Sequence, residues 1–372
     1  MTMQKRKILI LSATFYPANS PRSFRTTELA KEFARQGHEV VVYIPHNGFD
    51  YSAFLQEHPI QLKHLGKLSY KPIKLKGKKM EMLLRRGVKR ALGLLFEFPS
   101  IELMFKVSRH LKEESGYDML ISIAVPYPIH WGIARIRSGR NRIAKTWVAD
   151  CGDPYMGEAT DSFRKLFYFK YVEKWFFRKT DFISVPFEGA RSAYYPEFQE
   201  KIRIIPQGFR LDELAIPEYK KKEGCPVFAY AGSFIPGRRD PGPLLDCLLK
   251  NKAEFRFIVY TSQSGMLVPF KKKLGEKLII RDYVSRDDLL LVLAGMDFLI
   301  NFDNNTHTQL PSKLIDYAIT GRPIFNISSD TDLSIIMEFL KGDYSRKMDL
   351  PPSSDYDIRT VVKKFAQLQN SN

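Results

Sequence analysis

The fold of this chain is decided by residues 7–44, which read KILILSATFYPANSPRSFRTTELAKEFARQGHEVVVYI. The apolar run Lys7–Ser12 predicts a buried strand, and Val40–Ile44 predicts a second one. Between them, apolar side chains recur at helical spacing over Arg22–Gln36, which predicts a helix that ends at Gly37. A strand, a helix and a strand in this order indicate a parallel sheet with helices on its faces.

The same alternation continues along the rest of the chain. Further strands are predicted at 119–125, 145–149, 182–185, 201–206, 227–232, 255–260, 278–283, 298–302 and 324–327. Residues 211–224 hold Pro217 and several lysines and glutamates, a composition typical of a linker. We therefore expect an α/β protein with two Rossmann-like domains that face each other across a cleft. The predicted divisions are a first domain at 1–207, a linker at 208–224, a second domain at 225–350 and a C-terminal segment at 351–372.

The charge balance is strongly basic. The 372 residues include 58 lysines and arginines against 41 aspartates and glutamates, a formal net charge of +17. Such an excess indicates an anionic partner: nucleic acid, a lipid headgroup surface or a phosphorylated substrate. Three cysteines without CxxC spacing argue against a disulfide framework or a zinc site and favour a reducing compartment. No apolar run reaches the roughly 18 residues that a membrane span needs, so we expect a cytoplasmic protein.

Several motifs of nucleotide-binding and hydrolytic enzymes are absent. The sequence has neither GxGxxG after its first strand nor GxxxxGK(S/T), which disfavours a dinucleotide dehydrogenase and a P-loop enzyme. It also lacks HExxH and GxSxG. An anionic ligand would therefore have to be held by other residues.

One candidate anion site is the stretch 310–324, which reads LPSKLIDYAITGRPI and predicts a helix that starts at Pro311. The first turns carry Ser312, Lys313 and Asp316. The free N–H groups of a helix start and the charge of Lys313 can hold a phosphate. The carboxylate of Asp316 can accept hydrogen bonds from sugar hydroxyls. The alternative interpretation is an ordinary amphipathic helix with Lys313 in solvent.

A second basic group follows the first strand of the second domain. Gly232 and Ser233 lead into a loop that carries Arg238 and Arg239. Glycine lets a backbone approach a ligand, and the planar guanidinium group fits phosphate oxygens. A diphosphate held between Arg238 or Arg239 and Lys313 is one interpretation. The other is a solvated loop with two surface arginines.

Two aspartates, Asp150 and Asp153, follow the strand predicted at 145–149 and so stand at a carboxyl end of the sheet. Asp153 can orient an acceptor hydroxyl or take its proton. In the alternative interpretation, either aspartate caps the next segment or closes a turn.

The loop before the first helix offers a further anion site, because Asn19, Ser20, Arg22 and Arg25 flank a helix N-terminus. In the alternative interpretation, Ser20 caps this helix and both arginines face water. The two interpretations can hold at once.

The segment Lys63–Arg90 contains eleven lysines and arginines and one acidic residue, Glu81. From Leu84 onward, apolar residues recur at helical spacing while basic residues gather on another face. A basic amphipathic helix indicates an anionic membrane surface. Nucleic acid is a rival partner that no recognisable motif supports, and a solvated loop is the third interpretation.

Taken together, the ordered motifs resemble those of GT-B retaining glycosyltransferases that use nucleotide sugars, in particular bacterial enzymes of surface-polysaccharide assembly. The matching stretches read FYP at 15–17, GHEV at 37–40, WVADCGDPY at 147–155, IIPQGF at 204–209, AYAGS at 229–233, PSKLIDY at 311–317 and GRP at 321–323. Two positions differ from the family pattern. Asp316 stands where relatives carry a glutamate, and Thr308 stands where many carry another.

The resemblance implies a division of labour between the domains. The second domain would bind the nucleotide-diphosphate sugar, and the first would bind the acceptor. Arg238 and Lys313, with Asp153, would be catalytic, and no metal or cofactor would be needed. Donor-binding residues would be Gly232, Ser233, Arg239, Thr308, Gln309, Leu310, Pro311, Ser312 and Asp316. Acceptor-binding residues would be Asn19, Ser20, Arg22, Arg25 and Asp150. The C-terminal segment would form a helix that crosses back to the first domain.

The sequence thus predicts a hexosyltransferase that moves a sugar to a saccharide or polyprenyl-linked saccharide. It would be cytoplasmic and peripheral on the inner face of the plasma membrane, held there through Lys63–Arg90, with no nucleic-acid partner. One alternative is a sugar-nucleotide epimerase of the same fold, although no histidine–carboxylate cluster suits that reaction. The other is a non-catalytic scaffold that binds polyanions or membranes, which the charge and Thr308 favour.

Overall fold

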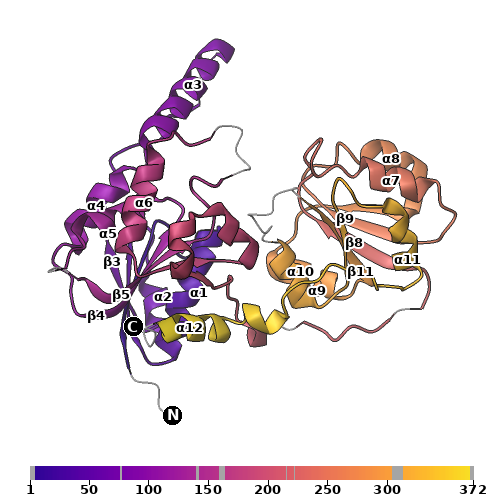
Figure 1. Ribbon diagram of the computed structural model, residues 1–372. Coiled ribbons are helices and arrows are strands. Elements are labelled where there is room, and N and C mark those ends of the chain that lie inside the picture. Colours follow the sequence, from indigo (N-terminus) through magenta and orange to yellow (C-terminus); the bar gives the residue numbers. More distant parts are fainter. Residues whose placement is uncertain are drawn as a thin grey trace. The chain divides into compact units, whose positions relative to one another are not determined.

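The structure is a computed structural model that describes residues 5–75, 78–139, 142–158, 164–214, 216–221, 223–303 and 313–368. The chain divides into two compact units. Unit 1 comprises Met1–Phe209 together with Ile358–Asn372, and unit 2 comprises Arg210–Asp357. Each unit contains a twisted parallel sheet with helices packed against it (Figure 1).

The sheet of unit 1 has seven parallel strands within the described residues, in the order β3-β2-β1-β4-β5-β6-β7. The strands are β1 (Lys7–Ser12), β2 (Glu39–Ile44), β3 (Ile60–His64), β4 (Tyr117–Ala124), β5 (Ala144–Cys151), β6 (Phe182–Val185) and β7 (Ile202–Ile204). The helices are α1 (Pro21–Arg35), α2 (Ser52–Glu57), α3 (Lys79–Phe96), α4 (Glu102–Leu111), α5 (Pro128–Ile136), α6 (Phe169–Lys179) and α12 (Ile358–Gln367).

The strand–helix–strand unit predicted at residues 7–44 is confirmed as β1, α1 and β2. Ser20 is the N-cap of α1, because its side chain accepts a hydrogen bond from the Ser23 N–H at 3.2 Å, and Pro21 follows in the first turn. Edge strand β3 was not predicted. The strand expected at 145–149 is longer, so Asp150 lies inside β5 instead of after it.

Both faces of this sheet are buried. Along β1, Leu9 and Leu11 belong to one hydrophobic cluster, while Ile8 and Ile10 belong to the cluster on the opposite face. Side chains alternate between the faces of a strand, so a run that is apolar at every position requires helices on both sides.

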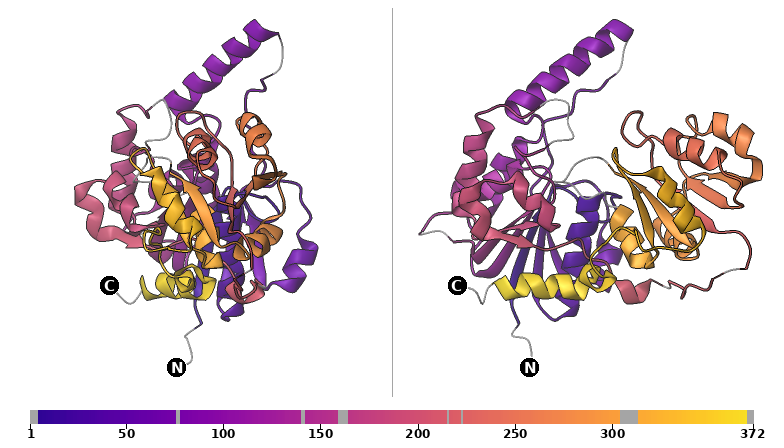
Figure 2. Two further views of the ribbon diagram at one scale, coloured as in Figure 1. Left: turned by 90° about the vertical axis from the view of Figure 1, so that its right-hand side faces the viewer. Right: turned by 45° about the vertical axis from the view of Figure 1, so that its right-hand side comes forward.

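Helix α12 returns to unit 1 and packs beside α1, as Figures 1 and 2 show. Its apolar side chains Ile358, Val361 and Phe365 join the cluster that contains Ile8. Gly208 permits this close approach, since a Cβ atom there would lie 2.6 Å from the Cδ1 atom of Ile358. The predicted return of the C-terminal helix to the first domain is therefore confirmed.

The sheet of unit 2 has five parallel strands within the described residues, in the order β10-β9-β8-β11-β12. These are β8 (Val227–Ala231), β9 (Arg256–Tyr260), β10 (Leu278–Arg281), β11 (Phe298–Phe302) and β12 (Ile324–Ile327). Its helices are α7 (Gly242–Leu249), α8 (Val268–Leu274), α9 (Arg286–Ala294), α10 (Lys313–Thr320) and α11 (Ile336–Leu340). The two parallel α/β sheets confirm the predicted fold class.

A buried ion pair joins three elements of unit 1. Arg25 on α1 donates to both carboxylate oxygens of Asp150, at 2.8 and 3.1 Å, and also to the backbone oxygens of Ile205 and Pro206. Both side chains are only 4% exposed. Burial alone would raise the pKa of Asp150, but the charge and hydrogen bonds of Arg25, with a hydrogen bond from Ser184, hold it below its ordinary value.

Replacement of Asp150 by alanine should lower the free energy of unfolding of unit 1 by about 3–5 kcal/mol, because it leaves Arg25 as an uncompensated buried charge. The three tryptophans, at 131, 147 and 175, all lie in unit 1, so urea unfolding followed by tryptophan fluorescence reports on this unit. Glu39→Ala is the control, because the Glu39–Lys7 pair is exposed and should contribute less than about 1 kcal/mol. Equal effects of the two substitutions would contradict this account.

Candidate functional site

The central feature of unit 2 is the side chain of Lys313, the first described residue of α10. Its Nζ atom is shielded from solvent and has no hydrogen-bond partner among the residues that the structure describes. The ammonium group lies over the ring of Tyr230, 4.4 Å from the ring centroid. A cation–π contact of this kind offsets only part of the cost of removing an ammonium group from water. The sequence interpretation that placed Lys313 in solvent is therefore wrong.

Burial and, to a smaller extent, the nearby charge of Arg239 lower the pKa of Lys313 to about 7, although the charge of Asp303 partly opposes the shift. A neutral ligand could supply a hydrogen-bond acceptor but no opposite charge, and a cationic ligand would repel the group. An anion would supply both a hydrogen-bond acceptor and an opposite charge, so the surroundings of Lys313 favour an anionic ligand.

Tyr230, at the end of β8, is held in place by its neighbours. Its ring stacks on Phe234 at 4.9 Å and meets Phe302 edge-on at 5.0 Å. Its hydroxyl donates to the backbone oxygen of Ser233 at 3.0 Å. The adjacent Ala231 N–H donates to the hydroxyl of Tyr317 at 3.0 Å, which ties the end of β8 to α10. The surface beneath the Lys313 ammonium is thus rigid.

The loop after β8 brings one of the two predicted arginines to this place. Arg239 is half-buried and affects the pKa of Lys313, whereas Arg238 is exposed. A tight turn fixes both residues, because the Arg238 N–H donates to the Ile235 oxygen at 3.0 Å and the Ile235 N–H donates to the Arg239 oxygen at 3.2 Å. Gly232 has a φ of +145°, a conformation that side chains rarely adopt. The structure thus favours Arg239 over Arg238 as the partner of Lys313.

Asp316 lies one turn further along α10, where Arg286 of α9 donates to its Oδ1 atom through two nitrogens, at 2.9 and 2.5 Å. Burial raises the pKa of Asp316, and the charge of Arg286 opposes this effect. The carboxylate is therefore oriented by Arg286 through its Oδ1 atom. The remaining predicted donor residues, Thr308, Gln309, Leu310, Pro311 and Ser312, lie outside the described residues.

In unit 1, the structure brings Arg22 and Asp153 together. An Arg22 nitrogen lies 2.5 Å from Asp153 Oδ2, and the Asp153 side chain is 44% exposed. The guanidinium group rests against Gly152, where an added Cβ would lie 1.8 Å from an Arg22 nitrogen. Tyr127 fixes the backbone, because its hydroxyl donates to the Asp153 oxygen at 2.6 Å. An accessible carboxylate is thus held by a positioned arginine.

The other predicted acceptor residues have separate surroundings. Arg25 and Asp150 form a buried ion pair with each other inside the unit. They therefore support the structure around Arg22 and Asp153 and do not face a substrate. Ser20 caps α1. Asn19 lines a cavity of about 580 Å³ between the first loop, α1 and α2, whose walls include the ring of Tyr16.

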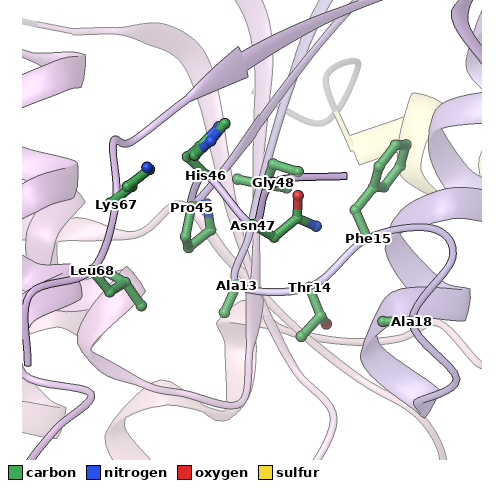
Figure 3. A pocket seen from close by; sticks show the side chains of 11 residues that line it. Ala13, Thr14, Phe15, Ala18, Pro45, His46, Asn47, Gly48, Lys67 and Leu68 are labelled. Atoms are coloured by element: carbon green, nitrogen blue, oxygen red, sulfur yellow. The ribbon is translucent and has the colours of Figure 1, made fainter. Parts of the chain in front are cut away.

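Sequence analysis missed a second cavity of about 620 Å³ at the carboxyl ends of β1, β2 and β3 (Figure 3). Its wall includes Thr14, whose buried hydroxyl oxygen has no hydrogen-bond partner among the described residues. His46, Asn47 and Lys67 contribute polar groups. The available signal was the pair His46-Asn47 directly after the strand predicted at 40–44, a position where sites occur in parallel sheets.

The described part of the chain contains neither a candidate metal site nor a candidate membrane span. No group of three or more histidine, cysteine, aspartate or glutamate side chains is arranged there to hold a metal ion. None of the helices described is both long and apolar enough to cross a bilayer.

Residues 24–213 match the sequence model of Glycosyltransferase Family 4. Among solved structures, the chain is similar to the lipopolysaccharide outer core galactosyltransferase WaaB in its apo form, with 12% identity, a TM-score of 0.59 and coverage of 98% of this chain and 99% of that one. It is also similar to Anabaena Alr3699/HepE in complex with UDP and glucose (11% identity, TM-score 0.58, coverage of 99% and 100%) and to TarM (10%, 0.62, 100% and 100%). No curated protein matches the sequence. These likenesses show the fold, which is the GT-B fold of two Rossmann-like domains.

The state of Lys313 makes anion binding to unit 2 dependent on pH. Above pH 7 the free ammonium loses its proton, and an anion that needs the charged form must restore it, which costs about 1.4 kcal/mol per pH unit. Sulfate does not itself titrate in this range, so its affinity should fall by up to about tenfold per pH unit above 7. Calorimetry in buffers of different ionisation enthalpy should show proton uptake on binding. Lys313→Met should abolish both effects, whereas Lys272→Met, at an exposed lysine of α8, should change neither.

Proposed function

Because the chain belongs to Glycosyltransferase Family 4, we propose that it transfers a hexose from a nucleoside-diphosphate sugar to a saccharide or lipid-linked saccharide in cell-surface polysaccharide synthesis. The observation that carries the proposal is the buried ammonium of Lys313, which lies beside Arg239 and has no hydrogen-bond partner among the described residues. A diphosphate is the anion that such a pair fits, since it offers two negative charges and several acceptor oxygens. The HepE complexes, which contain UDP, glucose or UDP-glucose, support a nucleotide-sugar donor.

In this reaction the bond between the anomeric carbon and the diphosphate breaks, and negative charge develops on the leaving oxygen. Positive groups fixed in advance around that oxygen stabilise the transition state more than the ground state. Lys313 and Arg239 would fill this role without a metal ion, and Arg238 would approach from the solvent side of the turn. Retention of the anomeric configuration is part of the proposal through the resemblance of the motifs.

On the acceptor side, Asp153 would accept the proton of the attacking hydroxyl group. Its pairing with Arg22 keeps the carboxylate in one orientation, and its exposure leaves it accessible to a substrate. Asn19 and the cavity beside it offer polar and aromatic groups to a saccharide. We further propose that the protein is cytoplasmic and acts at the inner face of the plasma membrane, where lipid-linked acceptors are found.

Lys313→Met should weaken the binding of the matching nucleoside diphosphate by about 10- to 100-fold, the contribution of one charge-assisted hydrogen bond. Calorimetry with UDP, GDP, dTDP and CDP measures this directly. The variant should also melt at a higher temperature than the wild type, because it removes a buried charge to which no described residue offers a hydrogen bond. Lys272→Met is the matched control. No heat with any of the four nucleotides, or equal affinity of the Lys313 variant, would refute the proposal.

Gly152→Ala should displace the Arg22 guanidinium from Asp153 and reduce the rate of sugar transfer. Asp153→Asn should reduce that rate by about 100-fold or more, because it removes the proposed proton acceptor. The measurement is product formation from a panel of nucleotide sugars and lipid-linked saccharides. Donor affinity should stay at the wild-type value in both variants. Gly139→Ala is the control, since a Cβ atom there meets nothing within 4 Å. Wild-type transfer rates in Asp153→Asn would exclude this role.

A further inference from the structure

Helix α3 is an 18-residue helix of unit 1 in which no residue is buried. Figures 1 and 2 show it extending away from the sheet of its own unit. Helices in folded proteins are stabilised mainly by packing an apolar face, and α3 packs none of its length against a core. The described residues therefore do not cover the apolar face of α3.

The apolar residues of α3 form one stripe. They recur at the i, i+3, i+4 and i+7 positions that share a helix face, and they line a shallow groove whose walls include Met80, Leu83, Leu84, Gly87, Val88 and Ala91. Met80 is 78% exposed, Leu83 is 65% exposed and Leu84 is 70% exposed. A contiguous stripe of large exposed apolar side chains marks a binding surface.

The opposite side of the helix is basic. α3 contains five lysines and arginines and one acidic residue, Glu81. At 100° per residue, Arg85, Arg86 and Lys89 lie on the face that points away from Leu84. All three side chains are exposed. Lys63, the start of the basic segment, instead lies in β3 and pairs with Glu114 at 2.6 Å, so it does not belong to the basic face of α3.

The base of the helix is fixed to unit 1. Glu97, directly after α3, accepts a hydrogen bond from the Tyr155 hydroxyl at 2.9 Å and forms an ion pair with Lys165. The Tyr168 hydroxyl donates to the backbone oxygen of Leu95. The exposed stripe is thus presented by a helix whose C-terminal end is anchored to the folded unit.

We propose that α3 is a membrane-docking element that lies in the plane of an anionic bilayer, with Met80, Leu83 and Leu84 among the acyl chains and its basic residues against the headgroups. This inference deepens the membrane part of the proposed function and rests on it. Charge complementarity favours an anionic bilayer as the partner of α3. A nucleic acid would pair with the basic face but leave the apolar stripe in water, and a second copy would bring two cationic helices together. An anionic bilayer satisfies both faces at once.

The test is co-sedimentation of the full chain with extruded vesicles. Wild type should bind vesicles of phosphatidylcholine with phosphatidylglycerol, bind pure phosphatidylcholine much more weakly, and lose affinity as salt is raised. Leu83→Asn with Leu84→Asn should weaken binding by about tenfold or more, as should Arg85→Glu with Arg86→Glu. The charge-matched control is Lys272→Glu with Lys273→Glu, at exposed positions of α8, which should bind like the wild type.

Three results would overturn the proposal: no binding of wild type to anionic vesicles, undiminished binding by the Leu83/Leu84 double variant, or an α3-dependent dimer in light scattering without vesicle binding. Calorimetry with UDP keeps the two proposals separate. Both α3 double variants should bind UDP like the wild type, because α3 and Lys313 belong to different units. A wild type that binds vesicles but no nucleotide would refute the donor proposal and leave the role of α3 standing.

Discussion

Unit 2 removes the ammonium group of Lys313 from water without giving it a hydrogen-bond partner among the described residues. A buried ammonium group costs several kcal/mol unless a partner compensates it. At Lys313 the described residues supply the face of Tyr230, the repulsion of Arg239 and the partial attraction of Asp303, but no hydrogen-bond acceptor. A fold tolerates such a cost where a ligand later removes it, so the unpaired charge is best understood as one half of a binding site.

A comparison with Arg25 shows what a structural cation looks like in the same chain. Arg25 is equally hidden from solvent, but two carboxylate oxygens and two backbone oxygens compensate its charge. Its pairing with Asp150 therefore fixes the carboxyl edge of the unit 1 sheet and places Arg22 and Asp153 at the surface. The charge of Arg25 thus stabilises the fold, whereas the charge of Lys313 can bind a substrate. In both units these groups stand beyond the carboxyl ends of parallel strands, where the loops converge.

Local pattern was enough to predict much of the fold. Residues 7–44 carry their own strand, cap, helix and stop signals, and the structure follows them closely. The return of α12 could be predicted only by resemblance, because it depends on contacts between distant residues, such as the approach of Ile358 to Gly208, 150 positions earlier. The position of Asp150 was missed because an aspartate ordinarily ends a strand, and only a distant arginine explains its presence inside β5.

The candidate site was less accessible to sequence analysis. The sequence does not distinguish Arg238 from Arg239. Only the turn at Ile235 leaves Arg238 exposed and Arg239 half-buried. The ammonium group of Lys313 lies over the ring of Tyr230, which is 83 positions earlier in the sequence. The Arg22–Asp153 pair joins two motifs that the sequence had treated separately. Amphipathic spacing indicated α3, but its lack of any buried residue is a property of the tertiary structure.

The most direct test is to measure the pKa of the Lys313 ammonium by NMR of its ε-carbon, assigned by comparison with Lys313→Met, in the free protein and with saturating UDP-glucose. The account predicts a value near 7 in the free protein and an increase of about one unit or more with the ligand, since the diphosphate favours the charged form. A free value close to the ordinary 10.5, or a value that UDP-glucose leaves unchanged, would contradict it.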